Sequence, residues 1–155
     1  MTRVERMRFS IPLEIVSLDD TSFHLFVPAR INGISCDLII DTGASKSVFA
    51  LNHVMKMLDD LPVSQPDLQS AGINANSLDS HTGVFRTFSL GNLFLTEWEV
   101  VLLDLSSIDA LYRSYHDRTI WGLIGSDFLL TYSARLDYGK KTLSLTVPKS
   151  CYKVG

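Results

Sequence analysis

Residues 36–47 read CDLIIDTGASKS, and three apolar residues in this stretch lead directly into Asp41. The four residues after Asp41 are all small, and one of them is Gly43. Because Asp and Gly are common in turns, the acid could be an ordinary turn residue at the end of a strand. The small residues would equally let a substrate backbone approach, and Gly43 permits a tight turn that holds the carboxylate rigidly. The stretch therefore marks Asp41 as a candidate catalytic carboxylate.

A hairpin is predicted directly before this stretch. Residues 22–40 alternate apolar and polar side chains around Asn32-Gly33, and Asn-Gly is a strong hairpin signal because both residues tolerate positive φ. We expect strands at about 23–31 and 34–40.

Short helices are predicted at two places. Apolar residues recur at helical spacing after the motif, at Val48, Leu51, Met55 and Leu58. This spacing predicts a short helix capped by Ser45 or Ser47. A second short helix is predicted from Ser107 to about Tyr115, with Ser106 as its cap.

The rest of the chain adds strands. VFRTFSL at 84–90 and LFLTEWEVVLL at 93–103 form a second predicted pair, joined at Gly91-Asn92. Residues 121–147 predict an apolar strand, a glycine turn, a short helical stretch and a closing hairpin. The predicted class is mostly β with a little helix.

The composition fits one domain over residues 1–155, with 46% hydrophobic and 10% aromatic residues available for a core. The 14 basic and 17 acidic residues give a net charge of −3 and form neither a basic stripe nor a polybasic segment. Nucleic acids and membrane surfaces are therefore not expected partners.

Export and membrane insertion are not expected. Charged residues between Arg3 and Arg8 interrupt any signal-peptide core, and no apolar run approaches the roughly 18 residues of a membrane span. The two cysteines, Cys36 and Cys151, lie far apart in no metal-type spacing, which indicates free thiols in a reducing compartment. We expect a cytoplasmic protein.

Two motifs give the chain a resemblance to a known family. Residues 39–45, IIDTGAS, resemble the apolar pair followed by Asp-Thr-Gly-Ala that marks the retropepsin-type aspartic proteases, the single-domain relatives of pepsin. Later, Leu123-Ile124-Gly125 followed by SDFLL resembles the family's second mark, an apolar strand end before a short helix. The resemblance covers roughly residues 20–147 and extends to the stand-alone bacterial members. It implies a closed acid-protease barrel, one half of a pepsin-type fold, with one or two short helices.

In this family a water molecule hydrolyses the peptide bond, with one carboxylate as base and a second, protonated carboxyl that polarises the carbonyl. The chain has one Asp-Thr-Gly, and Asp104, Asp127 and Asp137 lack the small-residue turn after them. The resemblance therefore implies a homodimer in which Asp41 of each copy supplies one carboxyl. It implies a peptide or protein substrate, and neither a cofactor nor a metal.

By the same resemblance, the residues after Asp41 support the catalytic loop. Thr42 would hydrogen-bond across the two-fold axis, Gly43 would receive the substrate backbone, and Ala44 matches the retroviral type. Because Ala44 has no hydroxyl to donate to the ionised carboxylate, we expect an activity optimum less acidic than that of pepsin. Ser45 stands where many retroviral enzymes have an acid, and it is a candidate substrate contact.

The polar segment 67–86, DLQSAGINANSLDSHTGVFR, stands where the family has its substrate-covering flap. Gly72 and Ile73 are the candidate substrate contacts in it. The segment has no glycine-rich tip and lacks the flap tyrosine of pepsins, so an ordinary surface loop is the alternative.

Other chemistries are poorly supported. Residues 43–47, GASKS, lack the glycines of a phosphate-binding loop. The four histidines are isolated and show no metal-ligand spacing. Cys36 suits a small buried side chain better than a nucleophile, and Trp98 and Trp121 suit the core or a dimer interface.

Two functions of different class remain open. The first is a homodimeric aspartic endopeptidase that uses Asp41 from each subunit. The second is a retropepsin-like dimer that serves binding or assembly, with weak or no proteolytic activity, because a fold does not guarantee a function. The intact Asp-Thr-Gly favours the first, and the unusual flap segment keeps the second open.

Overall fold

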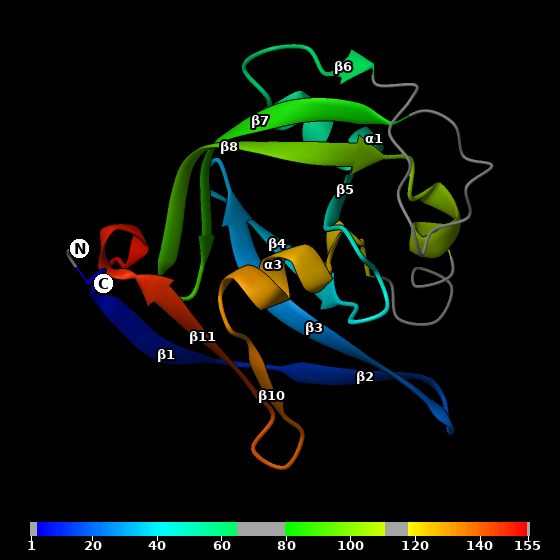
Figure 1. Cartoon of the computed structure of the whole chain (residues 1–155). Coiled ribbons are helices and arrows are strands. Elements are labelled where there is room, and N and C mark those ends of the chain that lie inside the picture. Colours follow the sequence, from blue (N-terminus) through cyan, green and yellow to red (C-terminus); the bar gives the residue numbers. More distant parts are fainter. Residues whose placement is uncertain (1–2, 65–79, 111–117, 155) are drawn as a thin grey trace.

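The computed structural model describes residues 3–64, 80–110 and 118–154 of the chain. Strands dominate and the helices are short (Figure 1). The strands are β1 (Arg6–Pro12), β2 (Glu14–Asp19), β3 (Ser22–Ile31), β4 (Ile34–Ile40), β5 (Val48–Ala50), β6 (Val63–Ser64), β7 (His81–Leu90), β8 (Leu93–Leu103), β9 (Gly122–Ile124), β10 (Arg135–Asp137) and β11 (Thr142–Pro148). The labelled helices are α1 (Leu51–Val54), α3 (Ser126–Thr131) and the 3-10 turns η1 (Met55–Met57) and η2 (Lys149–Cys151). None of the helices in the described ranges is long and apolar enough to span a membrane.

A closed barrel forms the centre of the molecule. Its strands follow the order β3-β4-β9-β5-β8-β7, and β7 pairs back onto β3. β2 and β6 extend the two ends of this sheet. Most neighbouring strands are antiparallel, but β4 runs parallel to β9 and β5 runs parallel to β8. The expected mostly-β class and closed barrel with short helices are confirmed.

The first predicted hairpin is also confirmed, since β3 and β4 pair antiparallel along their facing length. Both turn residues have positive φ, 49° at Asn32 and 81° at Gly33, as a tight two-residue hairpin loop requires. The Asn32 amide donates to the carbonyl of Met57 (2.6 Å) and accepts the N–H of Thr87 (3.1 Å). The turn is thereby joined to η1 and β7.

Aromatic side chains fill much of the barrel. Phe49, Phe85 and Phe88 are fully buried, and Trp98 packs against them. The rings of Phe49 and Phe85 meet edge to face with centroids 4.8 Å apart, and those of Phe88 and Trp98 lie 4.7 Å apart. Such contacts stabilise a core beyond the area that they bury. Trp98 therefore lies in the core, one of the two places predicted for it.

A separate three-stranded sheet, β1-β11-β10, lies beside the barrel (Figure 1). Along β1, Phe9 and Ile11 pack toward the core while Arg6 and Arg8 are exposed. No strand was predicted before residue 22, although the alternation in RMRFSIP is itself a strand signal.

The helix predicted after the motif begins later than expected. Val48–Ala50 form β5, which lies between β8 and β9 in the barrel. α1 then begins at Leu51, with Ala50 at its N-cap. The prediction that Ser45 or Ser47 caps this helix is therefore wrong. A short strand covered on both faces presents consecutive apolar residues, and these imitate the start of an amphipathic helix.

The second predicted helix is seen in part, since residues 106–110 are helical. Ser106 lies within this helix and does not precede it as a cap. Its N–H donates to the Asp104 carboxylate at 2.9 Å, and its hydroxyl donates to the same oxygen. These bonds from Ser106 lower the pKa of Asp104. Residues 111–117, which hold the rest of the predicted helix, lie outside the described residues.

Candidate active site

Asp41 directly follows β4, where the strand meets β9. The two strands pair in parallel through Ile39↔Leu123 and Ile40↔Ile124. The ladder continues past the strand end, because the Asp41 N–H donates to the Ile124 carbonyl at 2.9 Å. The backbone of the partly buried Asp41 is therefore held in place by β9 at the point where the chain leaves the sheet.

The small residues after Asp41 form a turn around its carboxylate. The Gly43 N–H donates to Asp41 Oδ1 at 3.0 Å, and the Ala44 N–H donates to the Asp41 carbonyl at 3.1 Å. A Cβ at Gly43 would lie 3.3 Å from the same carboxylate oxygen. Thr42 and Gly43 are exposed, whereas Ala44 is buried. The motif thus orients its own carboxylate and leaves the neighbouring backbone of Thr42 and Gly43 exposed.

The start of α3 supports this turn from behind. The Ser126 N–H donates to the Ala44 carbonyl at 2.8 Å, and the Ser126 hydroxyl donates to the Thr42 carbonyl at 3.0 Å. A Cβ at Gly125 would lie 2.7 Å from the Ala44 oxygen and 2.8 Å from the Lys46 oxygen. Only glycine fits at Gly125 without displacing the turn, which explains the glycine of the second motif.

A buried serine joins the same elements, and it was not predicted in this role. The N–H and the hydroxyl of Ser47 both lie 2.8 Å from Asp127 Oδ1 and donate to it. The Ser47 oxygen in turn accepts the N–H of Gly125 at 2.9 Å. The side chains of Ser47 and Asp127 are far apart in sequence, so no local pattern signals their contact. Together they close a hydrogen-bonded ring between the motif and α3.

Asp41 lies in a groove of about 380 Å³. The groove is lined by Phe23, His24, Leu25, Ile39, Ile40, Asp41, Thr42, Ile108, Leu123 and Tyr138. Asp41 is the one carboxylate among these lining residues, and most of the others are apolar. Such a lining suits an extended peptide that places apolar side chains beside a single polar centre.

The other predicted site residues lie around or beyond this groove. Ser45 is exposed on the turn that follows Gly43. Gly72 and Ile73 lie outside the described residues. Of the predicted flap segment 67–86, residues 81–86 belong to β7, which pairs antiparallel with β6, and residues 67–79 lie outside the described residues. Within the described part of the chain, no three His, Cys, Asp or Glu side chains are grouped to hold a metal.

A second hollow, of about 560 Å³, is lined by residues of β3 and β4, including Cys36, and by Arg118. The Arg118 guanidinium is paired there with Glu14 (2.7 Å) and Asp37 (3.0 Å). Burial, with a smaller contribution from the charge of Asp37, raises the pKa of Cys36 to about 12. A thiol held protonated in this way is a poor nucleophile, so this hollow does not compete with the groove as a reactive site.

Comparison with known proteins places this geometry in a family. A model of the aspartyl protease family matches residues 27–128. The retropepsin-like aspartic protease from Rickettsia conorii has a TM-score of 0.54 at 18% identity, over 95% of this chain and 96% of that chain. The retroviral protease-like domain of Ddi1 from Leishmania major gives 0.47 at 17% identity, over 81% and 92%. The EIAV protease in complex with the inhibitor HBY-793 gives 0.48 at 15% identity, over 72% and 90%.

No match was found among curated protein sequences. The likeness to the Rickettsia conorii structure shows a shared fold, and the family model covers well over half of the chain and includes the Asp-Thr-Gly turn. The chain therefore belongs to the aspartyl protease family and has the retropepsin-like fold.

Proposed function

We propose that the protein is an aspartic endopeptidase that works as a homodimer, with Asp41 of each copy forming the catalytic pair. The observation that carries the proposal is the Asp41 carboxylate itself. It is oriented by the Gly43 N–H at 3.0 Å and lies in an otherwise largely apolar groove. A carboxylate held in one orientation inside a groove is a candidate general acid or base.

The reaction needs two carboxyl groups in different protonation states. One Asp41 carboxylate takes a proton from water as the water oxygen attacks the carbonyl carbon of the substrate. The protonated carboxyl of the other copy gives its proton to the carbonyl oxygen. The tetrahedral diol then collapses: the C–N bond breaks, the leaving amine takes the proton from the carboxyl that had accepted it, and one diol hydroxyl returns its proton to the other carboxylate, which restores the pair. Two such groups about 3 Å apart share one proton, because they cannot both ionise.

A second copy is the simplest source of the second carboxyl. Asp41 is the one acid lining the described groove, and the sequence has no other Asp-Thr-Gly. Thr42 and Gly43 are exposed beside it, so this turn is free to meet a two-fold partner and a substrate backbone. The apolar lining favours a peptide or protein substrate with apolar side chains next to the bond that is cleaved.

Asp41→Asn tests the proposal, because it keeps the shape of the side chain and removes the ionisable carboxyl. Wild-type protein and the variant would be incubated with a diverse peptide library from pH 3 to pH 8, with oligomeric state followed by light scattering. We expect a dimer whose cleavage is lost in Asp41→Asn, with an optimum above about pH 3. Asp20→Asn removes an exposed acid in the turn after β2 and serves as the matched control.

Each contrary result has a distinct meaning. A well-formed wild-type dimer that cleaves nothing would favour a binding or assembly role. Cleavage that survives Asp41→Asn would assign the activity to another group or to a contaminant. A protein that stays monomeric while it cleaves peptides would contradict the two-chain pair.

A further inference from the structure

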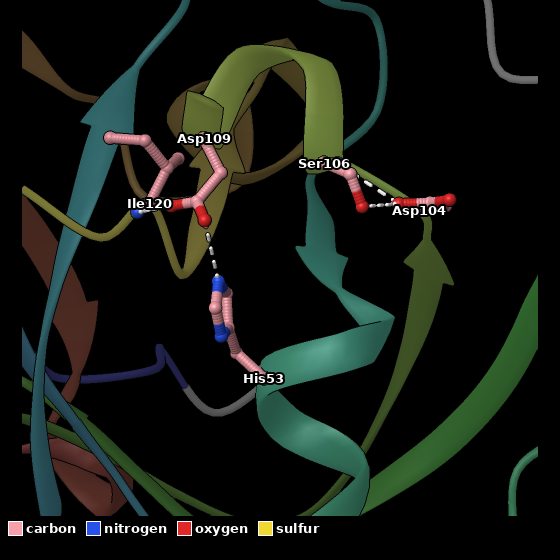
Figure 2. Close-up of polar contacts among 5 residues, drawn as sticks. All are labelled: His53, Asp104, Ser106, Asp109 and Ile120. Carbon is pink, nitrogen blue, oxygen red and sulfur yellow. Dashed lines mark hydrogen bonds and ion pairs between the residues drawn. The ribbon is translucent and has the colours of Figure 1, made fainter. Parts of the chain in front are cut away.

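Asp109 carries a buried carboxylate that the proposed reaction does not use. The residue is 7% exposed and lies in the helical segment 106–110. Its Oδ1 accepts the N–H of Ile120 at 2.8 Å, and its Oδ2 lies 3.2 Å from Nε2 of His53 (Figure 2). A buried carboxylate is costly unless its oxygens are hydrogen-bonded. The contacts with His53 and Ile120 therefore stabilise Asp109 in the interior and tie the three residues together.

Asp109 joins three segments, and the one that carries His53 comes from a distant part of the chain. In Figure 2, His53 reaches from α1 toward Asp109, and Ile120 lies beside the same carboxylate. The His53 ring also packs on Trp121, with centroids 5.4 Å apart. The carboxylate therefore links α1, the helical segment and the residues that lead into β9.

Two of these segments supply walls of the Asp41 groove. Ile108, next to Asp109 in sequence, lines the groove, and so does Leu123 of β9. Leu123 is held by strand pairing on both sides. Ile108 belongs to no strand and is only partly buried against an apolar cluster, so its position depends on the contacts that hold the helical segment 106–110 in place. Helices in proteins gain most of their stability from tertiary contacts.

We infer that Asp109 is a positioning residue that fixes Ile108 in the wall of the groove and thereby sets which substrate side chain fits beside Asp41. The substrate part of this inference rests on the proposed endopeptidase function. Its structural part, the position of Ile108, does not.

The test compares Asp109→Ala with Asp109→Asn. Asparagine keeps an oxygen that can accept the Ile120 N–H, whereas alanine removes both contacts. Steady-state cleavage would be measured on matched peptides in which one apolar residue is varied among Ala, Leu and Trp. We expect Asp109→Ala to shift the ratio of kcat/KM for Trp over Leu by about tenfold toward the larger side chain, since a freed Ile108 no longer limits the groove. Asp109→Asn should stay within about twofold of wild type.

A double variant separates this role from a general loss of stability. If Asp109 acts through Ile108, Asp109→Ala should change the peptide ratio little further in an Ile108→Ala background. Asn32→Gly is the control, because Asn32 also joins two segments through its side chain but lies outside the groove lining. Glycine tolerates its φ of 49°. Asn32→Gly should lower Tm and leave the ratio unchanged.

The δ1-methyl NMR signal of Ile108, assigned with Ile108→Val, gives a reading that needs no cleavage. We expect the signal to move or broaden in Asp109→Ala and to stay in place in Asn32→Gly. An unchanged Ile108 signal in Asp109→Ala overturns the inference, whether or not the protein is active. The inference is also overturned if Asp109→Ala shifts the kcat/KM ratio equally in the wild-type and Ile108→Ala backgrounds. A wild-type protein without activity rejects the proposed function alone, and the Ile108 signal still decides the position of this wall.

Discussion

The thiol of Cys36 points into the interior from β4, and 6% of the residue is exposed. Burial is the main cause that raises its pKa to about 12 from a usual value of 9.0. Between these two pH values the unfolded chain loses the thiol proton more readily than the folded protein does. Folding is therefore favoured by this group below about pH 9 and progressively less as the pH rises toward 12.

We accordingly expect the free energy of unfolding to fall above pH 9 more steeply in wild type than in Cys36→Ala. Between pH 9 and pH 12, the free energy of unfolding should fall by at most about 4 kcal/mol more in wild type than in Cys36→Ala, since each pKa unit is worth about 1.4 kcal/mol. Urea unfolding at several alkaline pH values measures it. Parallel slopes for the two proteins would show that Cys36 is not protected as its burial indicates, and Cys151→Ala controls for the other thiol.

At the scale of elements, the contact between the turn that carries Asp41 and α3 depends on the Ser47 hydroxyl. This group donates to Asp127 and accepts the buried N–H of Gly125. Ser47→Ala leaves that N–H without its acceptor, which costs about 1–3 kcal/mol of stability. We expect a lower Tm together with a lower kcat, because the turn that carries Asp41 loses a support. Thermal unfolding and peptide cleavage measure the two effects.

Ser144→Ala is a suitable comparison, since Ser144 bonds to another hydroxyl, Ser10, on the exposed face of the small sheet. Its loss should leave both Tm and kcat close to wild type. If Ser47→Ala behaved like Ser144→Ala, the hydrogen-bonded ring behind the turn would have no role in holding the carboxylate.

The sequence predicted the elements that depend on local patterns. The hairpin at Asn32-Gly33 is such an element, because two residues fix its turn. β5 was missed, since a three-residue strand buried on both faces has no alternation to read. Asp41 could be identified as a candidate catalytic residue from its neighbours in sequence. The contacts Ser47–Asp127 and His53–Asp109 were not, because tertiary folding brings their partners together from distant positions.

At the scale of the whole molecule, the proposed pairing of Asp41 from two copies predicts that an inactive subunit lowers the activity of its partner. When wild type is mixed with an equal amount of Asp41→Asn under conditions of subunit exchange, about a quarter of the dimers carry two carboxyl groups. The cleavage rate should then fall to about half of that of the same wild-type protein alone. Peptide cleavage before and after mixing measures this, and a large excess of the variant should suppress activity almost fully.

The same mixture with Asp20→Asn should cleave faster than wild type alone, because that variant retains Asp41. A rate that Asp41→Asn leaves unchanged would mean that each subunit acts by itself. That outcome would require a second carboxyl from within one chain.

The parallel contact between β4 and β9 also determines at what point of its synthesis the chain can form the Asp41 site. Asp41 is synthesised well before its backbone partner Ile124 and before α3, which supports the Asp41 turn from behind. Chains grow from the N-terminus, and contacts between distant segments close late. An unfinished polypeptide on the ribosome thus contains the Asp-Thr-Gly sequence but cannot hold its carboxylate in the groove. The order of translation by itself therefore leaves the Asp-Thr-Gly turn without its supports until the barrel is complete.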